Sequence, residues 1–154
     1  MDEIIKLVHI ASVCLMFGAT MSNGVLHLMA RSAGLTEARQ TLLAAVMAVN
    51  KRAMGPSFFG IVISGFLMVI RLDLTLGALW LWLSISLTAV LVSGFIIGYS
   101  VEAKLEKITQ EKLKGIGEDH AKRYGRTFKM GLPIGSGAAL ISLAIIYLMI
   151  AKPH

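Results

Sequence analysis

Long apolar stretches alternate with short charged segments along the whole chain. A helix needs about 20 consecutive apolar residues to cross the hydrocarbon core of a bilayer. Four such stretches lie between charged residues, at 7–30, 55–70, 76–100 and 132–151. The second is short, and it could begin near residue 41 and continue through a kink at Pro56. The pattern therefore predicts an all-α fold, an integral membrane four-helix bundle.

The segment between the third and fourth stretches has a different pattern. Val101, Leu105 and Ile108 recur at helical intervals among charged residues, and Gly115 and Gly117 follow. This spacing predicts that the third helix leaves the membrane as an amphipathic helix and breaks at the glycines. Alternating charges are typical of a solvated helical hairpin, whereas the functional alternative is a docking surface for a partner or for anionic lipid.

Composition supports a single membrane domain in a lipid bilayer. The chain of 154 residues is 56% hydrophobic and 16% charged, with a mean hydropathy of +0.74. Its net charge of +6 does not indicate nucleic-acid binding, because the basic residues flank apolar stretches or interleave with acids.

The distribution of Lys and Arg predicts the orientation. Twelve of these residues lie in the two loops that follow the first and third stretches, and Lys6, Arg71 and Lys152 lie on the other side. The positive-inside rule then places both long loops in the cytoplasm and both termini outside, in a bacterial inner membrane.

Polar residues recur along one face of the first stretch. At 100° per residue, a single stripe holds His9, Ser12, Met16, Thr20, Asn23 and His27. Lipid cannot satisfy such groups, so the stripe should face the bundle interior. Ser12, Thr20 and Asn23 could simply hydrogen-bond neighbouring helices. In the sequence His27 has only Arg31 nearby, and it could simply reach the interface.

His9 is predicted to lie at the outer end of the bundle, level with Arg71 and Lys152. Met68 and Met149 approach the same level. Such a set could bind haem b, with His9 as the axial ligand of the iron, the two cations on the propionates, and Met149, Met68 or no side chain as second ligand. It could equally bind an anionic quinol-like or porphyrin substrate.

Other chemistries have weaker support. The nine methionines are scattered, so a copper site is disfavoured. Because Glu102 ends the third stretch, the predicted spans hold no Asp or Glu, which argues against a proton-coupled transporter. Two glycine pairs, Gly94 with Gly98 and Gly131 with Gly135, could serve packing within the bundle or form a face for a homo-oligomer or a larger membrane complex.

Three segments carry a resemblance to a known family. "IKLVHIASVCLMFG", "MGPSFFGIVISGFLMV" and the ending from Tyr124 to Pro153 resemble bacterial four-span predicted integral membrane proteins of unknown function, domain of unknown function twenty-two sixty-nine. That family looks related to CopD-like copper-resistance proteins and to HemJ-type protoporphyrinogen oxidases. The latter likeness implies a haem-dependent membrane oxidoreductase that uses His9 and Lys152.

Two functions follow as hypotheses. The first is a haem-associated redox protein, or one that binds a porphyrin or quinol-like ligand near the outer face. The second is a non-catalytic small subunit or assembly factor that packs against a larger membrane complex through its glycine faces.

Overall fold

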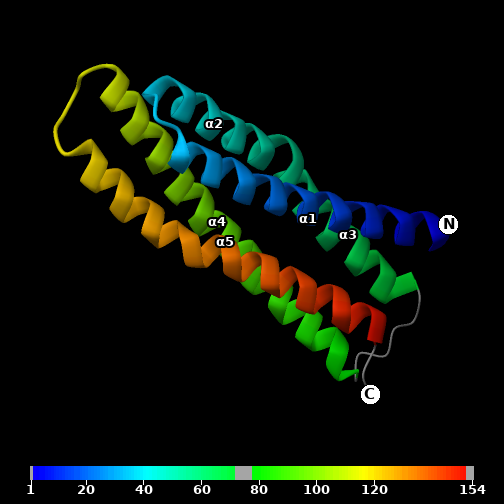
Figure 1. Ribbon diagram of the computed structural model, residues 1–154. Coiled ribbons are helices and arrows are strands. Elements are labelled where there is room, and N and C mark those ends of the chain that lie inside the picture. Colours follow the sequence, from blue (N-terminus) through cyan, green and yellow to red (C-terminus); the bar gives the residue numbers. More distant parts are fainter. Residues whose placement is uncertain (1, 72–77, 152–154) are drawn as a thin grey trace.

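The computed structural model describes residues 2–71 and 78–151, which form long helices joined by short turns (Figure 1). The helices are α1 (Asp2–Ser32), α2 (Thr36–Val49), the π-helical segment η1 (Asn50–Met54), α3 (Gly55–Arg71), α4 (Leu79–Leu113) and α5 (His120–Ala151). Because α2, η1 and α3 follow one another without a break, the described residues contain four long helices and no strand. The predicted all-α four-helix bundle is confirmed.

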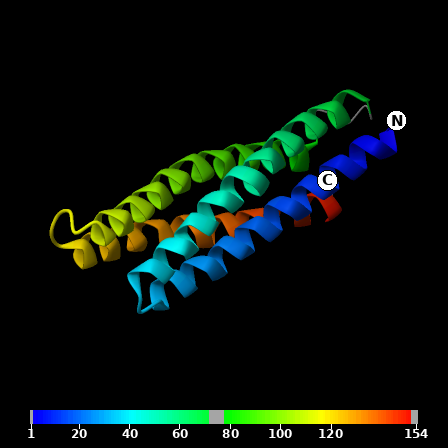
Figure 2. The ribbon, with the colours of Figure 1, turned by 90° about the horizontal axis from the view of Figure 1, so that it is seen from above.

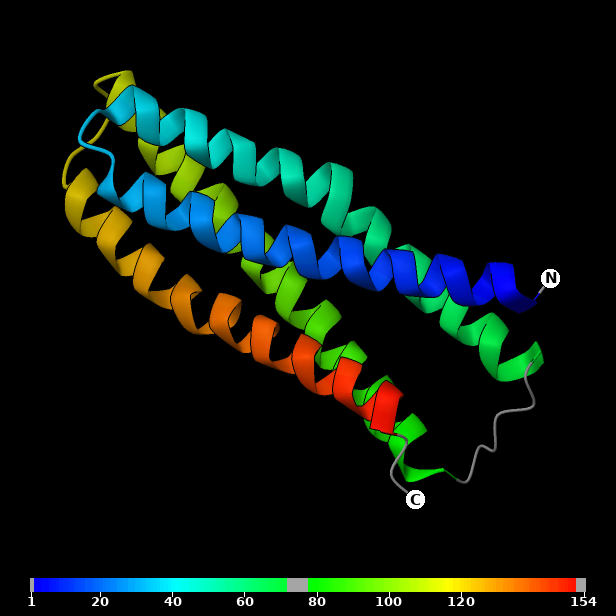
Figure 3. The same cartoon turned by 45° about the vertical axis from the view of Figure 1, so that its right-hand side comes forward.

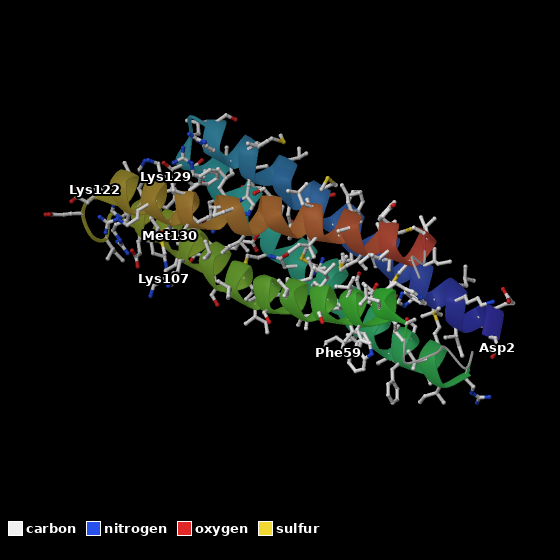
Figure 4. The ribbon with its side chains drawn as sticks, turned by 90° about the horizontal axis from the view of Figure 1, so that it is seen from below. Asp2, Phe59, Lys107, Lys122, Lys129 and Met130 are labelled. Carbon is white, nitrogen blue, oxygen red and sulfur yellow. The ribbon has the colours of Figure 1, made fainter. Side chains whose placement is uncertain are left out.

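The exterior of this bundle is apolar. Phe59, Phe66 and Ile150 are 72%, 66% and 79% exposed, and Figure 4 shows the Phe59 side chain directed away from the helices. Serine, asparagine and histidine side chains lie buried inside instead. A soluble domain has the reverse distribution, and all four helices are long and apolar enough to cross a membrane. The chain is therefore an integral, multi-pass membrane protein.

The helices extend beyond the predicted spans. The second long helix begins at Thr36, upstream of the start near residue 41 that the sequence suggested, and the fourth begins at His120 rather than at Leu132. Residues 76 and 77 of the predicted third span lie outside the described residues.

Successive long helices run antiparallel, so that both termini lie at one end of the bundle (Figures 1 and 2). Helix α1 packs along α2 and α3, and α4 packs along α5, whereas α1 and α5 touch less extensively. Figure 3 shows the two pairs diverging toward the end at which the termini lie. We call the opposite end, where α4 turns into α5, the hairpin end.

Two apolar clusters hold the helices together. The first joins all four long helices midway along the bundle through Met16, Phe58, Leu91 and Ile145, among others. The second lies toward the hairpin end and includes Ala30, Leu43, Leu105, Ile108, Tyr124 and Phe128. These two clusters fix the positions of the four long helices, and the polar residues described below lie on the same helices.

The turn between α4 and α5 follows the sequence prediction. Gly115 and Gly117 adopt φ values of +66° and +87°, in the left-handed region that glycine enters without steric cost. Helix α4 ends at Leu113, immediately before them. The glycines thus reverse the chain and bring the charged parts of α4 and α5 side by side.

Candidate functional site

The polar stripe of α1 lies against the other helices. His9, Met16 and Asn23 are buried, with 6%, 4% and 6% of their surface exposed. Ser12, Thr20 and His27 are half-buried. The hydroxyl of Thr20 donates to the carbonyl of Met16 in its own helix, at 3.0 Å, so this residue needs no partner from another helix.

The ring of His9 is hydrogen-bonded to a serine of α3. Its Nδ1 lies 2.9 Å from Oγ of Ser64, and the Ser64 hydroxyl itself donates to the carbonyl of Gly60. Because a hydroxyl has only one proton to donate, it accepts from His9, and Nδ1 carries the proton. The lone pair of the neutral ring therefore lies on Nε2, which is buried and has no hydrogen-bond partner among the described residues.

Close contact between α1 and α3 surrounds this histidine. A Cβ atom on Gly65 would lie 3.5 Å from Cε1 of the His9 ring, and one on Gly60 would clash with the hydroxyl of Ser12. The small residues of α3 let the two backbones approach closely, as in other membrane helix pairs. His9 is therefore buried in the contact between α1 and α3.

The structure does not bring together the whole set predicted around His9. Arg71 is exposed and lies seven residues beyond Ser64, or about 10 Å along α3 at 1.5 Å per residue. Met68 is half-buried, and Met149 packs against the apolar cluster midway along the bundle. Lys152 lies outside the described residues. The assignment of these side chains to a cofactor stays a prediction.

His27 has a hydrogen-bond partner in another helix, which the sequence did not suggest. Its Nε2 lies 3.0 Å from Oε1 of Glu102 in α4, and the other oxygen of this carboxylate accepts a hydrogen bond from the amide of Asn50. Oδ1 of Asn50 in turn accepts from Nδ2 of Asn23, at 2.7 Å. The expectation that only Arg31 lies near His27 is therefore wrong. Three helical segments, α1, η1 and α4, share one hydrogen-bonded chain.

The carboxylate sets the direction of every hydrogen bond in this chain. Glu102 accepts only, so it receives a proton donor from both His27 and Asn50. The amide oxygen of Asn50 then faces Asn23, which must present its own NH₂ group. The hydrogen-bonded chain begins at Asn23 and ends at His27, and an acceptor atom is left over at each of these ends. These atoms are Oδ1 of Asn23 and, in neutral imidazole, Nδ1 of His27. Both atoms are buried and unpaired among the described residues.

A π-helical segment presents Asn50 to this network. Pro56 has no N–H, so a regular α-helix would lose a hydrogen bond there. In the structure the N–H of Gly55, the residue just before it, bonds to the carbonyl of Asn50, five residues back. Such a widened turn shifts the register of the side chains, and π-helical turns are frequent at functional sites. The predicted kink at Pro56 is thus a π-helical turn immediately before it, and Asn50 is 1% exposed.

A cavity of about 420 Å³ adjoins the network between α1, α4 and α5. Asn23, His27 and Glu102 line it, as do the hydroxyl-bearing residues Thr20, Tyr99 and Ser136. Most of the remaining wall is apolar, with Met16, Leu91 and Phe95 as examples. This volume lies within the range of small-molecule sites, which are similarly apolar with a few convergent polar groups. His9 is not among the residues that line it.

Glycines create the space. Gly94, Gly98, Gly131 and Gly135 all line the cavity. A Cβ on Gly131 would lie 3.1 Å from Val101, and one on Gly98 would lie 3.5 Å from Ile134, so these two serve the contact between α4 and α5. Gly94 and Gly135 have no atom within 4 Å of such a Cβ and face open space. One glycine of each pair, Gly98 and Gly131, therefore serves packing within the bundle.

The haem interpretation has one point in its favour and one against it. The buried lone pair on Nε2 of His9 is a suitable axial ligand for iron. However, α3 packs against the edge of the same ring, and the cavity between α1, α4 and α5 does not include His9. No cluster of three or more His, Cys, Asp or Glu side chains that could hold a metal ion occurs in the described part of the chain.

Comparison with known proteins identifies the class. The family model of the predicted integral membrane proteins DUF2269 matches residues 3–153, and the chain belongs to this family. No curated protein and no solved structure matches it. The family description agrees with the four apolar helices, and it gives no function.

Proposed function

We propose that the protein binds a hydrophobic small molecule with a hydroxyl-bearing head, such as a quinol, in the cavity between α1, α4 and α5. One observation carries this proposal. Oδ1 of Asn23 and Nδ1 of His27 are buried hydrogen-bond acceptors with no partner in the described part of the chain, and both residues line the cavity. Buried polar groups in native proteins are nearly always paired. A head group that donates hydrogen bonds would pair them.

The rest of the cavity suits the hydrophobic body of such a molecule. Its wall is mostly apolar, and Met16, Met21 and Met54 contribute flexible thioether side chains that adapt to an irregular ligand. The surrounding exterior faces lipid, so a lipid-soluble ligand would enter from the bilayer rather than from water. These features favour a quinol-like molecule over a charged metabolite.

Glu102 determines what the head-group residues can do. Its carboxylate accepts from Nε2 of His27 and so keeps Nδ1 free as an acceptor. If His27 took up the proton of a bound hydroxyl, the same carboxylate would stabilise the resulting imidazolium. Asn50 holds the carboxylate in place through its second oxygen. The chain of residues can thus bind a hydroxyl and hold its proton.

Filling the cavity tests the proposal. Gly94→Leu would place a side chain in open space within the cavity, and Gly18→Leu is the matched control, because Gly18 is exposed on α1 and its Cβ also meets no atom within 4 Å. Equilibrium dialysis of decylubiquinol against the detergent-purified proteins should show at least tenfold weaker binding to the first variant, with the control unchanged. Equal binding to all three proteins, or no binding to the wild type, would overturn the proposal.

Haem b, or another porphyrin, bound by His9 is a second candidate. The unpaired lone pair on Nε2 of this buried histidine favours it. Reconstitution with haem should then give a Soret band that disappears in His9→Ala and persists in His27→Ala. A colourless protein after reconstitution would exclude this candidate. A Soret band lost only in His27→Ala would indicate that haem binds in the cavity beside His27 instead of at His9.

We also propose a bacterial inner membrane as the location, with both termini outside, on the distribution of Lys and Arg described above. An alkaline phosphatase fused after residue 154 should be active, because this enzyme folds only outside the cytoplasm. An inactive but stably expressed fusion would indicate the opposite orientation, with the C-terminus in the cytoplasm.

A further inference from the structure

A second cavity lies at the hairpin end, outside the network. Its volume is about 610 Å³, and it lies between α4 and α5. Five cations line it, with Ile108 at its apolar side: Lys104, Lys107, Lys122, Arg123 and Arg126. In Figure 4, Lys107 of α4 and Lys122 of α5 both lie at this end of the bundle.

Most of this positive charge is unpaired. Arg123 donates to Glu111 at 2.9 Å. The other four cations form no hydrogen bond or ion pair within residues 2–71 and 78–151, and Asp119 is the other carboxylate that lines the cavity. All four are exposed, and with one unpaired carboxylate they give this surface a positive charge that attracts anions.

The position of the cavity along the helices identifies the kind of anion. The apolar stretch of α4 ends at Ser100, so Lys104 and Lys107 lie about 6 and 10 Å beyond it at 1.5 Å per residue. Arg126 lies about 9 Å before the apolar stretch that begins at Leu132. The headgroup layer of a bilayer is about 5–8 Å thick on each side, and Lys and Arg side chains reach back toward it. Lys104 is therefore at headgroup depth, and the side chains of Lys107 and Arg126 can reach back to it.

We propose that this cavity binds the phosphate headgroup of an anionic membrane lipid. Lys104, Lys107 and Arg126 would contact the phosphate. A membrane lipid fits better than a soluble phosphate because the cations lie beside the bilayer, where lipid phosphates are concentrated. This inference is independent of the ligand proposed for the cavity between α1, α4 and α5.

The experiment compares two triple variants of equal charge. Lys104→Gln, Lys107→Gln and Arg126→Gln together remove three cations of the cavity, whereas Lys112→Gln, Lys114→Gln and Lys129→Gln remove three cations of the same hairpin that do not line it. The probes are short-chain phosphatidylglycerol, phosphatidylcholine and inorganic phosphate. Binding to the detergent-purified protein is followed by native mass spectrometry and by thermal stabilisation.

The expected result is selective. Phosphatidylglycerol should bind more tightly than phosphatidylcholine, and its affinity should fall roughly 100-fold in the cavity triple, since each cation near an anionic surface contributes about fivefold. The control triple should change it less than threefold. If both triple variants lost the same affinity for phosphatidylglycerol, net charge alone would attract the lipid, and the proposal would be overturned. Inorganic phosphate that binds as tightly as the lipid would overturn the choice of a lipid.

Discussion

The two histidines of α1 occupy opposite kinds of environment, although the sequence places both on one stripe. His9 is paired with a neutral hydroxyl, that of Ser64, in the tight contact between α1 and α3. His27 is paired with the carboxylate of Glu102, which also receives Asn50, and a cavity of about 420 Å³ adjoins it. Each histidine keeps one buried ring nitrogen without a partner among the described residues, Nε2 of His9 and Nδ1 of His27, but of the two residues only His27 lines this cavity.

The difference shows what separates packing from binding in a membrane bundle. Polar side chains at helix contacts contribute modestly to association, since each finds a neutral partner and no space remains. A buried charge is costly unless donors pair with it, and Glu102 has two, Nε2 of His27 and the amide of Asn50. Glu102 thereby fixes the direction of the hydrogen bonds from Asn23 to His27.

Removal of the Glu102 carboxylate should have the largest effect on the free energy of unfolding. Glu102→Ala leaves Nε2 of His27 and the amide of Asn50 without their acceptor, and each unsatisfied buried group costs about 1–3 kcal/mol. We expect a loss of about 2–3 kcal/mol in the free energy of unfolding, measured by circular dichroism in mixed micelles. Glu106→Ala, which removes an exposed contact with Gln110, should cost less than 0.5 kcal/mol. Equal losses of unfolding free energy in Glu102→Ala and Glu106→Ala would contradict a special role for Glu102.

Crowding the contact between α1 and α3 should have an intermediate effect. Gly60→Leu forces a side chain against Ser12 and should destabilise the protein by about 2 kcal/mol, as overpacking does. The same unfolding measurement on Gly18→Leu, in open space, should show no loss. If Gly60→Leu were as stable as the wild type, the contact around His9 would not be tight.

Removal of the partner of His9 should have the smallest effect. Ser64→Ala deletes the hydrogen bond to Nδ1, and such bonds between membrane helices average about 0.6 kcal/mol. We expect a loss of this size in the unfolding free energy, with binding of decylubiquinol unchanged. A loss above 2 kcal/mol, or weaker ligand binding, would give His9 a larger role than joining two helices.

Much of the fold follows from hydropathy. Long apolar stretches indicated the four helices, and Gly115 with Gly117 indicated the turn between α4 and α5. These features are local, because each depends on residues adjacent in the chain. The start of the second helix was less accurate, since the charged residues that precede Gly55 continue the helix instead of ending it.

The candidate site was harder to predict because it depends on neighbours that the sequence does not specify. Glu102 was interpreted as the charge that ends the third span, and only the packing of α4 beside α1 shows that its oxygens meet His27 and Asn50. The π-helical turn, which a uniform step of 100° cannot represent, changes the register at Asn50. The sequence also could not show that Ser64, seven residues before Arg71 in α3, is the residue that His9 meets.

The direction of the hydrogen bonds gives the most direct test of the proposed ligand. Because Oδ1 of Asn23 and Nδ1 of His27 both accept, a reduced head group with two hydroxyls should bind, whereas its oxidised form offers only carbonyl acceptors. Each net hydrogen bond is worth about 1 kcal/mol, so two correspond to roughly 30-fold in affinity. The measurement is the ratio of the dissociation constants of decylubiquinone and decylubiquinol for the same preparation. We predict a ratio between roughly 10 and 30; equal constants, or tighter binding of the quinone, would contradict the account.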